Sequence, residues 1–310
     1  MPTVNSVLGP LDTAKLGFTL THEHIAISSA GIPQVYPEFF DHGAKMEAAL
    51  AELRAVHALG VRTIVDVTTL DLGRDIRFMR EVSRRSGVQV VAATGIWRDI
   101  PRAFWTASPD RIASLFVREI EKGIEGTEVK AGIIKVANDQ GGVTPEGEII
   151  LRAAARAHKA TGVPISTHHW APERVGEQQV RVFEDEGVDL NRVYIGHSSD
   201  TTDVAYLTGL LEKGVWLGID RLPGRVLPET PRWPQRAETV KKLFDAGWAR
   251  RVMISHDWPM TSEAGREYNP DGLRFIPDRF IPRLLELGVS RDAVRLMTVD
   301  NARRFFEGSR

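Results

Sequence analysis

The chain has 310 residues, with 40 Lys and Arg against 41 Asp and Glu, and it contains no cysteine. The balanced charge argues against a nucleic-acid-binding surface, and the lack of cysteine excludes disulfides, thiolate metal ligands and a cysteine nucleophile. No apolar run reaches the roughly 18 residues of a membrane span, and the first residues lack the pattern of a signal peptide. We therefore expect a cytoplasmic protein, unless a leader has been removed.

Short apolar runs alternate with amphipathic stretches along the whole chain. The apolar runs predict strands at residues 18–21, 63–67, 88–93, 132–136, 164–167, 193–196, 215–219 and 252–255. Helices are expected between them, at residues 45–59, 75–85, 110–124, 144–162, 178–186, 204–213 and 237–246. A glycine stands at or just beyond the end of each helix, where it can adopt the left-handed conformation that terminates helices.

This serial βα order predicts an α/β fold, a single-domain (β/α)8 TIM barrel over residues 1–310. A doubly wound open sheet is the alternative, but no GxGxxG motif follows the first strand. Two long segments, 221–235 and 258–276, follow the last two strands. In a barrel both would lie at the carboxyl ends of the strands, where active sites are built.

Metal-binding residue types stand at the ends of the predicted strands. In Thr21-His22-Glu23-His24, residues two apart point to the same side of a strand, so His22 and His24 project together. Four later strands end in Lys135, His168, His197 and Asp257. Six of the nine histidines lie at such ends, namely His22, His24, His168, His169, His197 and His256. Histidines of an ordinary core would not gather at one end of a barrel, so the pattern predicts a metal site.

Lys135 is the unusual member of this set, because an ammonium group is repelled by divalent cations. Its amine could be neutral and act as a Schiff-base nucleophile. Alternatively, the neutral amine could add CO2 and form a carbamate that bridges two metal ions. The neighbouring histidines favour the carbamate. A Schiff-base lyase that uses Lys135 without a metal, and a barrel that only binds a ligand, are the other functions considered.

At these residues the chain resembles the phosphotriesterase family of the amidohydrolase superfamily, which includes the phosphotriesterase-like lactonases. The resemblance extends over residues 9–306 and is carried by segments 17–24, 63–66, 73–75, 131–135, 196–200 and 255–257. It implies a binuclear metal centre, with zinc expected first and cobalt, manganese or iron also compatible. The more buried ion would be bound by His22, His24 and Asp257, the more exposed ion by His168 and His197, and both by a carboxylated Lys135.

The resemblance also implies a mechanism in which a hydroxide bridging the two metals attacks the substrate. Asp257 would accept the proton and Asp200 would pass it outward. Trp97 matches an aromatic wall of the pocket. The other expected pocket residues are Leu72, Arg98, Arg221 and Met260. His169 would take a second-shell or surface position, and His256 would face away from Asp257.

The expected substrates are small organophosphate triesters, as for an aryldialkylphosphatase, together with lactones or aryl esters. Segments 28–31, 37–40 and 269–277 resemble the phosphotriesterase branch. Arg98 and the short segment 221–235 instead favour a lactonase with incidental triesterase activity, because a cation suits an aryl leaving group poorly. The resemblance further implies a homodimer.

Overall fold

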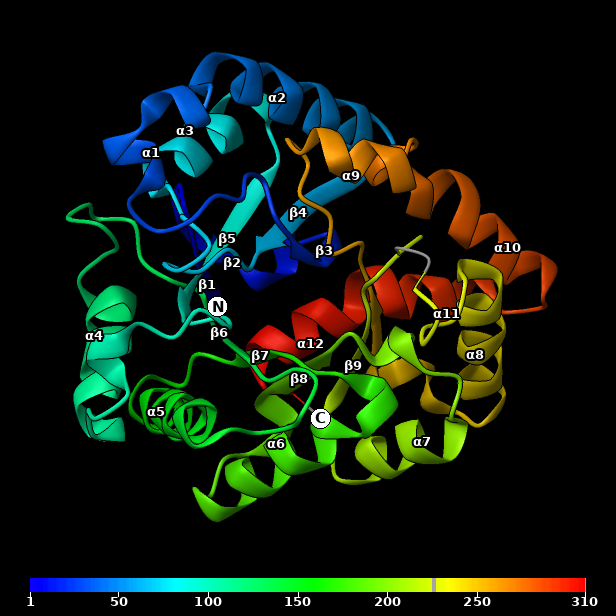
Figure 1. Ribbon diagram of the computed structural model, residues 1–310. Coiled ribbons are helices and arrows are strands. Elements are labelled where there is room, and N and C mark those ends of the chain that lie inside the picture. Colours follow the sequence, from blue (N-terminus) through cyan, green and yellow to red (C-terminus); the bar gives the residue numbers. More distant parts are fainter. Residues whose placement is uncertain (225–226, 310) are drawn as a thin grey trace.

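The computed structural model describes residues 1–224 and 227–309. Eight parallel strands curl into a nearly closed barrel in simple chain order (Figure 1). The strands are β3 (Phe18–Glu23), β4 (Val61–Asp66), β5 (Gln89–Gly95), β6 (Ile133–Ala137), β7 (Ile165–His168), β8 (Val193–Gly196), β9 (Trp216–Ile219) and β10 (Val252–Ile254). The last strand meets the first through the amide of Asp257, which donates to the carbonyl of His22 at 3.0 Å. The predicted (β/α)8 barrel is therefore confirmed.

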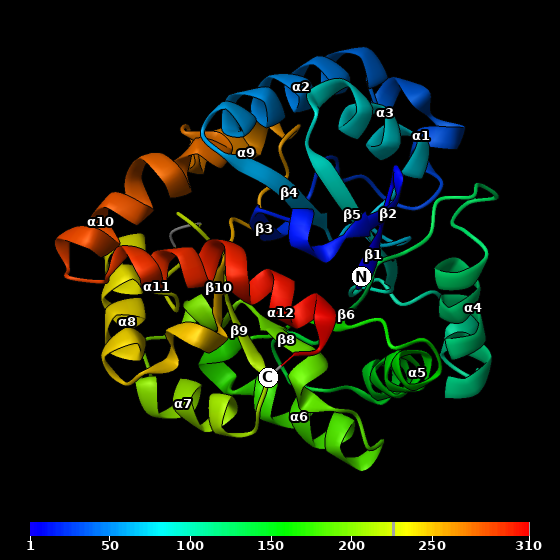
Figure 2. The ribbon, with the colours of Figure 1, turned by 180° about the vertical axis from the view of Figure 1, so that it is seen from behind.

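Helices surround the barrel, as Figures 1 and 2 show from opposite sides. Those expected from the sequence are α2 (His42–Ala58), α3 (Ile76–Ser86), α4 (Pro109–Glu121), α5 (Pro145–Thr161), α6 (Val175–Asp185), α7 (Val204–Glu212) and α8 (Trp233–Asp245). The sequence pattern fixes their ends locally. Thr144, for example, caps α5 by accepting from the amide of Gly147 at 3.1 Å, and Gly162 ends it at a φ of 74°.

Several elements were not predicted. A two-stranded hairpin, β1 (Thr3–Ser6) and β2 (Gly9–Asp12), precedes the barrel. The short helices are α1 (Ile32–Val35), α9 (Glu263–Tyr268), α10 (Ile281–Glu286), α11 (Arg291–Arg295) and α12 (Asn301–Glu307). Phe305 of α12 packs its ring against Tyr194 and Trp216, near the beginnings of β8 and β9. None of the helices in the described ranges is long and apolar enough to cross a membrane.

The core has two layers, as expected for parallel strands covered on both faces. One cluster fills the space between strands and helices, and a second includes Val65, Val91, Ile133 and Met253. Ile133 belongs to this second cluster inside the barrel. Because Lys135 follows two residues later, it points to the same side, toward the carboxyl-terminal mouth.

Candidate metal centre

The strand ends bring the predicted ligands together around Asp257. From β3 and the residue directly after it, the Nε2 atoms of His22 and His24 lie 3.4 and 3.3 Å from the same oxygen, Oδ1 of Asp257. These three residues form a group that could hold a metal ion. From β6, Nζ of Lys135 lies 3.0 Å from Nε2 of His22. The predicted buried half of the site thus has its donor atoms facing a common point.

The other two histidines form a second, adjacent group. Nε2 of His197, just after β8, lies 2.9 Å from Nδ1 of His168 at the end of β7. The same His197 atom lies 3.8 Å from Oδ2 of Asp257. Oδ1 of Asp257 therefore faces the two histidines of the first group, while Oδ2 lies on the side of His197 and pairs with Arg221 at 3.0 Å.

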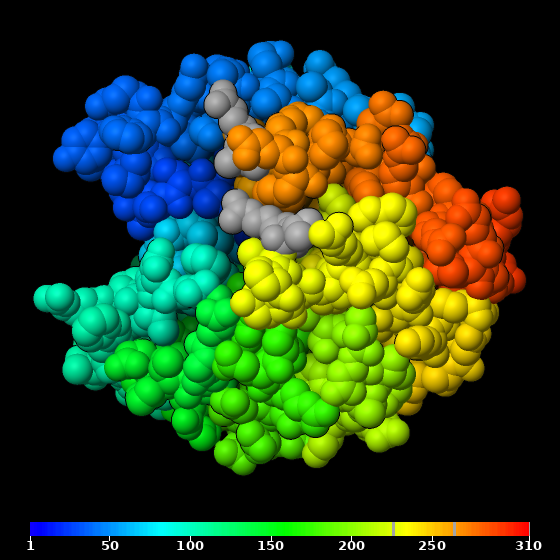
Figure 3. All heavy atoms as spheres, turned by 45° about the vertical axis from the view of Figure 1, so that its right-hand side comes forward, coloured from blue at the N-terminus to red at the C-terminus, as the bar shows by residue number. Residues whose placement is uncertain are grey.

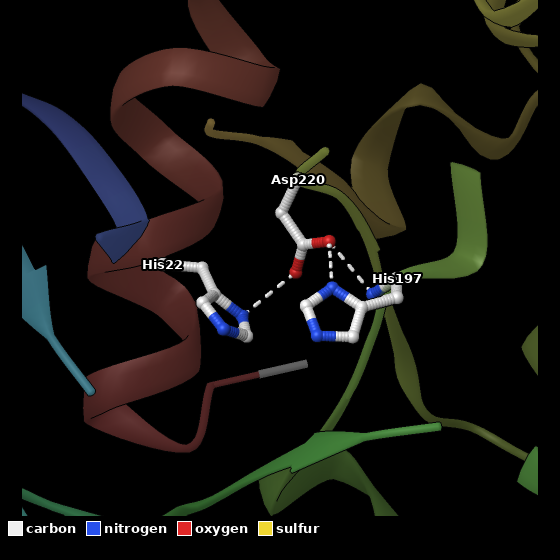
Figure 4. Close-up of side chains that lie close together, drawn as sticks. All are labelled: His22, His197 and Asp220. Atoms are coloured by element: carbon white, nitrogen blue, oxygen red, sulfur yellow. Dashed lines mark hydrogen bonds and ion pairs between the residues drawn. The ribbon is translucent and has the colours of Figure 1, made fainter. Parts of the chain in front are cut away.

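Asp220, directly after β9, supports one histidine of each group (Figure 4). Its Oδ2 lies 2.9 Å from Nδ1 of His22, and its Oδ1 lies 3.0 Å from Nδ1 of His197 and accepts from the His197 amide at 2.7 Å. The hydroxyl of Tyr194 also donates to it, at 2.8 Å. A carboxylate that holds Nδ1 of a histidine leaves Nε2 free for a metal. Asp220, His22 and His197 also form a possible metal group, but we interpret Asp220 as the residue that orients the other two.

Asp220 was not among the predicted site residues. It follows the apolar strand at 216–219, as His168 and Asp257 follow theirs, so the strand-end pattern could have indicated it. His24 has its own support, because its Nδ1 lies 2.8 Å from Oγ1 of Thr68.

Glu23, the last residue of β3, lies between His22 and His24 and points to the opposite side. It is fully buried, and it accepts from the Ser255 hydroxyl at 2.7 Å and from the His256 amide at 2.9 Å. Its oxygen also lies 2.7 Å from Nδ1 of His256. The Glu23–His256 pair joins β3 to the segment after β10 and so fixes His22 and His24 relative to Asp257.

His169 is completely buried, and its Nδ1 lies 2.5 Å from the carbonyl of Gly196. The surface position considered for it is therefore wrong, because its ring is buried near the Tyr206 ring of α7, with the two ring centroids 6.2 Å apart. It supports the backbone just before His197.

The backbone around the site is tightly constrained. His197 and Asp257 have φ values of 65° and 53°, a left-handed conformation that side chains other than glycine rarely adopt. A Cβ on Gly95 would lie 1.9 Å from the carbonyl oxygen of Lys135. Added Cβ atoms on Gly196 and Gly218 would lie 3.1 and 2.4 Å from Oδ2 of Asp220. These three glycines leave the space in which Lys135 and Asp220 fit.

Burial sets the protonation of the histidines and of Lys135. It lowers the pKa of His168 to about 3 and also lowers the pKa values of His22 and His197. These imidazoles are neutral at pH 7, which is the form that binds metals. Burial also lowers the pKa of Lys135 to about 7, against the opposing effect of nearby carboxylates. For Asp257, burial raises the pKa, but His197 and the surrounding histidines outweigh it and hold the carboxyl well below its usual range.

Arg221 bridges Asp257 and the predicted relay residue Asp200. Its Nε donates to Asp257 at 3.0 Å, and its Nη1 donates to Asp200 at 2.5 Å. Arg236 binds the other oxygen of Asp200 at 3.0 Å. Both oxygens of this buried carboxylate therefore accept from guanidinium groups, and Arg221 lies between it and Asp257.

A pocket of about 400 Å³ opens over this site. The segments after β9 and β10, yellow and orange in Figure 3, lie side by side on the surface, and both contribute residues to the pocket. Of the predicted pocket residues, Arg98 and Arg221 line it. Leu72 and Met260 are buried and are not among the described lining residues. The indole N–H of Trp97 points to Nδ1 of His168 at 3.3 Å.

Residues 2–306 match the phosphotriesterase family. The chain belongs to this family. A phosphotriesterase homology protein of Mycobacterium tuberculosis is 41% identical over 323 residues, covering 99% of this chain and 98% of that protein. An aryldialkylphosphatase of Saccharolobus solfataricus is 37% identical, covering 96% of each chain. The solved structure of the phosphotriesterase from M. tuberculosis superposes with a TM-score of 0.93 at 40% identity and covers 99% of this chain and 98% of its own. The resemblance stated from the sequence is confirmed, and membership of the phosphotriesterase family indicates a hydrolase.

Proposed function

We propose that this member of the phosphotriesterase family is a binuclear metal-dependent hydrolase of organophosphate triesters that also cleaves lactones or aryl esters. The observation that carries the proposal is the convergence of two neighbouring donor groups on the two oxygens of Asp257. The 37% identity to an aryldialkylphosphatase supports the substrate class.

The donor set suits two divalent cations. The buried ion would be held by His22, His24 and Asp257, and the exposed one by His168 and His197. The donors are neutral imidazoles and a carboxylate, which suit zinc and also cobalt, manganese or iron. Lys135 would bridge the ions as a carbamate, since its buried amine lies 3.0 Å from Nε2 of His22 and an ammonium group there would be repelled by the cations. The cations would supply an activated hydroxide and polarise the oxygen of the substrate.

The chain's own residues then position the reaction and move its proton. Asp257 faces both donor groups and would accept the proton of the attacking nucleophile. Arg221 holds Asp257 from the pocket side and links it to Asp200, which we propose to assist the outward passage of the proton. Trp97 projects its indole toward the same place and would form one wall for the substrate.

The charge of the pocket favours the lactonase alternative. Arg98, Arg221 and Arg236 line it together with Asp139 and Asp257. A rim of this polarity suits a carbonyl oxygen and a polar ring better than a hydrophobic aryl leaving group.

The deciding experiment compares kcat/KM for a paraoxon-type triester and a simple δ-lactone with the zinc-loaded protein. We expect turnover of both, abolished by a chelator and restored by metal. A tenfold difference, about 1.4 kcal/mol in transition-state energy, would identify the preferred class. Turnover of neither compound would refute the proposal. Activity that survives the chelator, with borohydride trapping of substrate on Lys135, would establish the lyase instead.

We also propose that the protein acts in the cytoplasm as a homodimer. An apolar patch, formed by Val35, Tyr36 and Phe39 on α1 and the following turn, has exposed fractions of 64%, 50% and 76%. Exposed apolar residues that cluster on a surface typically mark an interface. The second copy is the partner that we assign to this patch.

Light scattering after size exclusion tests the dimer. We expect the native protein to be a dimer and Phe39→Glu to be a monomer, because the new carboxylate would be buried without a partner. Leu59→Glu is the matched control, since Leu59 is 40% exposed at the end of α2, and it should leave the dimer intact. A monomeric native protein would refute the proposal, and a dimeric Phe39→Glu protein would place the interface elsewhere.

A further inference from the structure

Asp139 lies two residues beyond β6 and contacts two functional groups. Its Oδ2 lies 3.3 Å from Nε2 of His168, and the same oxygen pairs with the guanidinium of Arg98. The carboxylate is only 15% exposed, and its other oxygen accepts from the amide of Gln140 at 3.0 Å. It therefore links a predicted metal ligand to the rim of the pocket.

The loop that carries Asp139 is fixed against the strand that carries His168. Gln179 of α6 donates both to the side-chain oxygen of Asn138, at 3.0 Å, and to the carbonyl of His168, at 2.8 Å. The Asn138 amide donates to that same carbonyl at 3.0 Å. Buried hydrogen bonds of the Gln179 side chain and of the backbone thus hold the loop of Asp139 beside His168.

The orientation of His168 is opposite to that of the other supported histidines. His22 and His197 turn Nδ1 toward Asp220 and Nε2 toward the site. His168 turns Nε2 toward Asp139, at 3.3 Å and without the geometry of a hydrogen bond. Its Nδ1 faces Nε2 of His197 at 2.9 Å and accepts from the indole N–H of Trp97 at 3.3 Å. A neutral imidazole has one N–H donor and one acceptor, and a carboxylate beside one nitrogen favours the proton there.

We propose that Asp139 is a positioning residue that keeps the proton of His168 on Nε2 and so leaves Nδ1 as the donor to the more exposed cation. The assignment of His168 as a ligand rests on the proposed function. The tautomer of His168 and its dependence on Asp139 are independent of the proposed function, because both can be measured in metal-free protein.

The first test is an NMR experiment on the ¹⁵N-labelled apoprotein that correlates imidazole nitrogens with ring protons. The His168 signals are assigned by their loss in His168→Asn. We expect the Nε2–H tautomer in the native protein and in Gln140→Ala, the matched control from the same loop. Asp139→Ala should shift His168 to a mixture or to the Nδ1–H tautomer. An Nδ1–H tautomer in the native protein, or no change in Asp139→Ala, would overturn the proposal.

The second test is zinc titration against a competing chelator. Loss of a carboxylate that orients a metal-binding histidine weakens binding by roughly 10- to 100-fold. We expect that loss in Asp139→Ala at the second, weaker site only, with both sites intact in Gln140→Ala. An equal loss of zinc affinity at both sites, or no loss at either site, would contradict a role specific to His168. If the native protein binds fewer than two ions, the binuclear function fails, while the NMR result still decides the role of Asp139.

Discussion

Lys135→Ala is expected to lose both metal ions and nearly all hydrolase activity together. Lys135 is the residue that we propose to contact both cations, and its buried amine lies 3.0 Å from His22. Losing the metal-activated nucleophile and the polarising cation should cost about 5 kcal/mol of transition-state stabilisation, or between about 10³- and 10⁴-fold in kcat/KM. Metal content after dialysis and kcat/KM on the better substrate measure the two losses.

Short carboxylic acids such as propionate should partly restore both properties in Lys135→Ala, since they can enter the space of the missing side chain and bridge the cations. Lys130→Ala, an exposed lysine three residues before β6, should keep native metal content and activity. Full activity of Lys135→Ala without any additive would exclude the bridging role. Metal retention with lost activity would indicate an amine nucleophile instead.

Asp220→Asn is the second substitution with a large expected effect, although Asp220 is not a proposed ligand. The Asn side chain can accept hydrogen bonds only through its single oxygen, so it cannot orient both His22 and His197 as the native carboxylate does. Each misoriented ligand costs roughly 10- to 100-fold in metal affinity or activity. Since the two histidines serve different cations, we expect both to bind more weakly and kcat/KM to fall by about 10²- to 10⁴-fold.

Circular dichroism should show a folded Asp220→Asn protein, because the amide oxygen can still accept from the buried Tyr194 hydroxyl. Asp245→Asn, in an exposed pair with Lys241, is the surface control and should change neither metal content nor activity. Native metal affinity in Asp220→Asn would mean that packing alone orients the two imidazoles.

The barrel could be predicted because each strand is an apolar run between a helix-ending glycine and a polar group. The predicted strand at 193–196 coincides with β8, and the one at 215–219 differs from β9 by one residue. The elements after β10 could not be predicted in the same way. Pro277 and Pro282 interrupt the helical sequence pattern there. π-Helical turns at Ile276–Phe280 and Leu296–Asp300 divide the helices into short segments.

The same reasoning explains which site residues were found. His22, His24 and Lys135 stand on strands, where alternation fixes the direction of a side chain. Asp139 stands in a loop, where no periodicity determines direction, and its contacts with His168 and Arg98 depend on the folded loop. The pocket lining was predicted less well for this reason, since Arg98 and Arg221 line the pocket while Leu72 and Met260 are buried outside its described lining.

The close packing around the glycines beneath the site limits which substitutions the site can accept. Positions 95, 196 and 218 cannot gain even a methyl group without displacing Lys135, Thr167 or Asp220. Single substitutions at these three glycines are therefore expected to disturb the site. Substitutions that change the substrate preference are expected at the rim of the pocket instead. Half-exposed side chains there, such as Arg98, can be replaced without displacing the residues of the metal site.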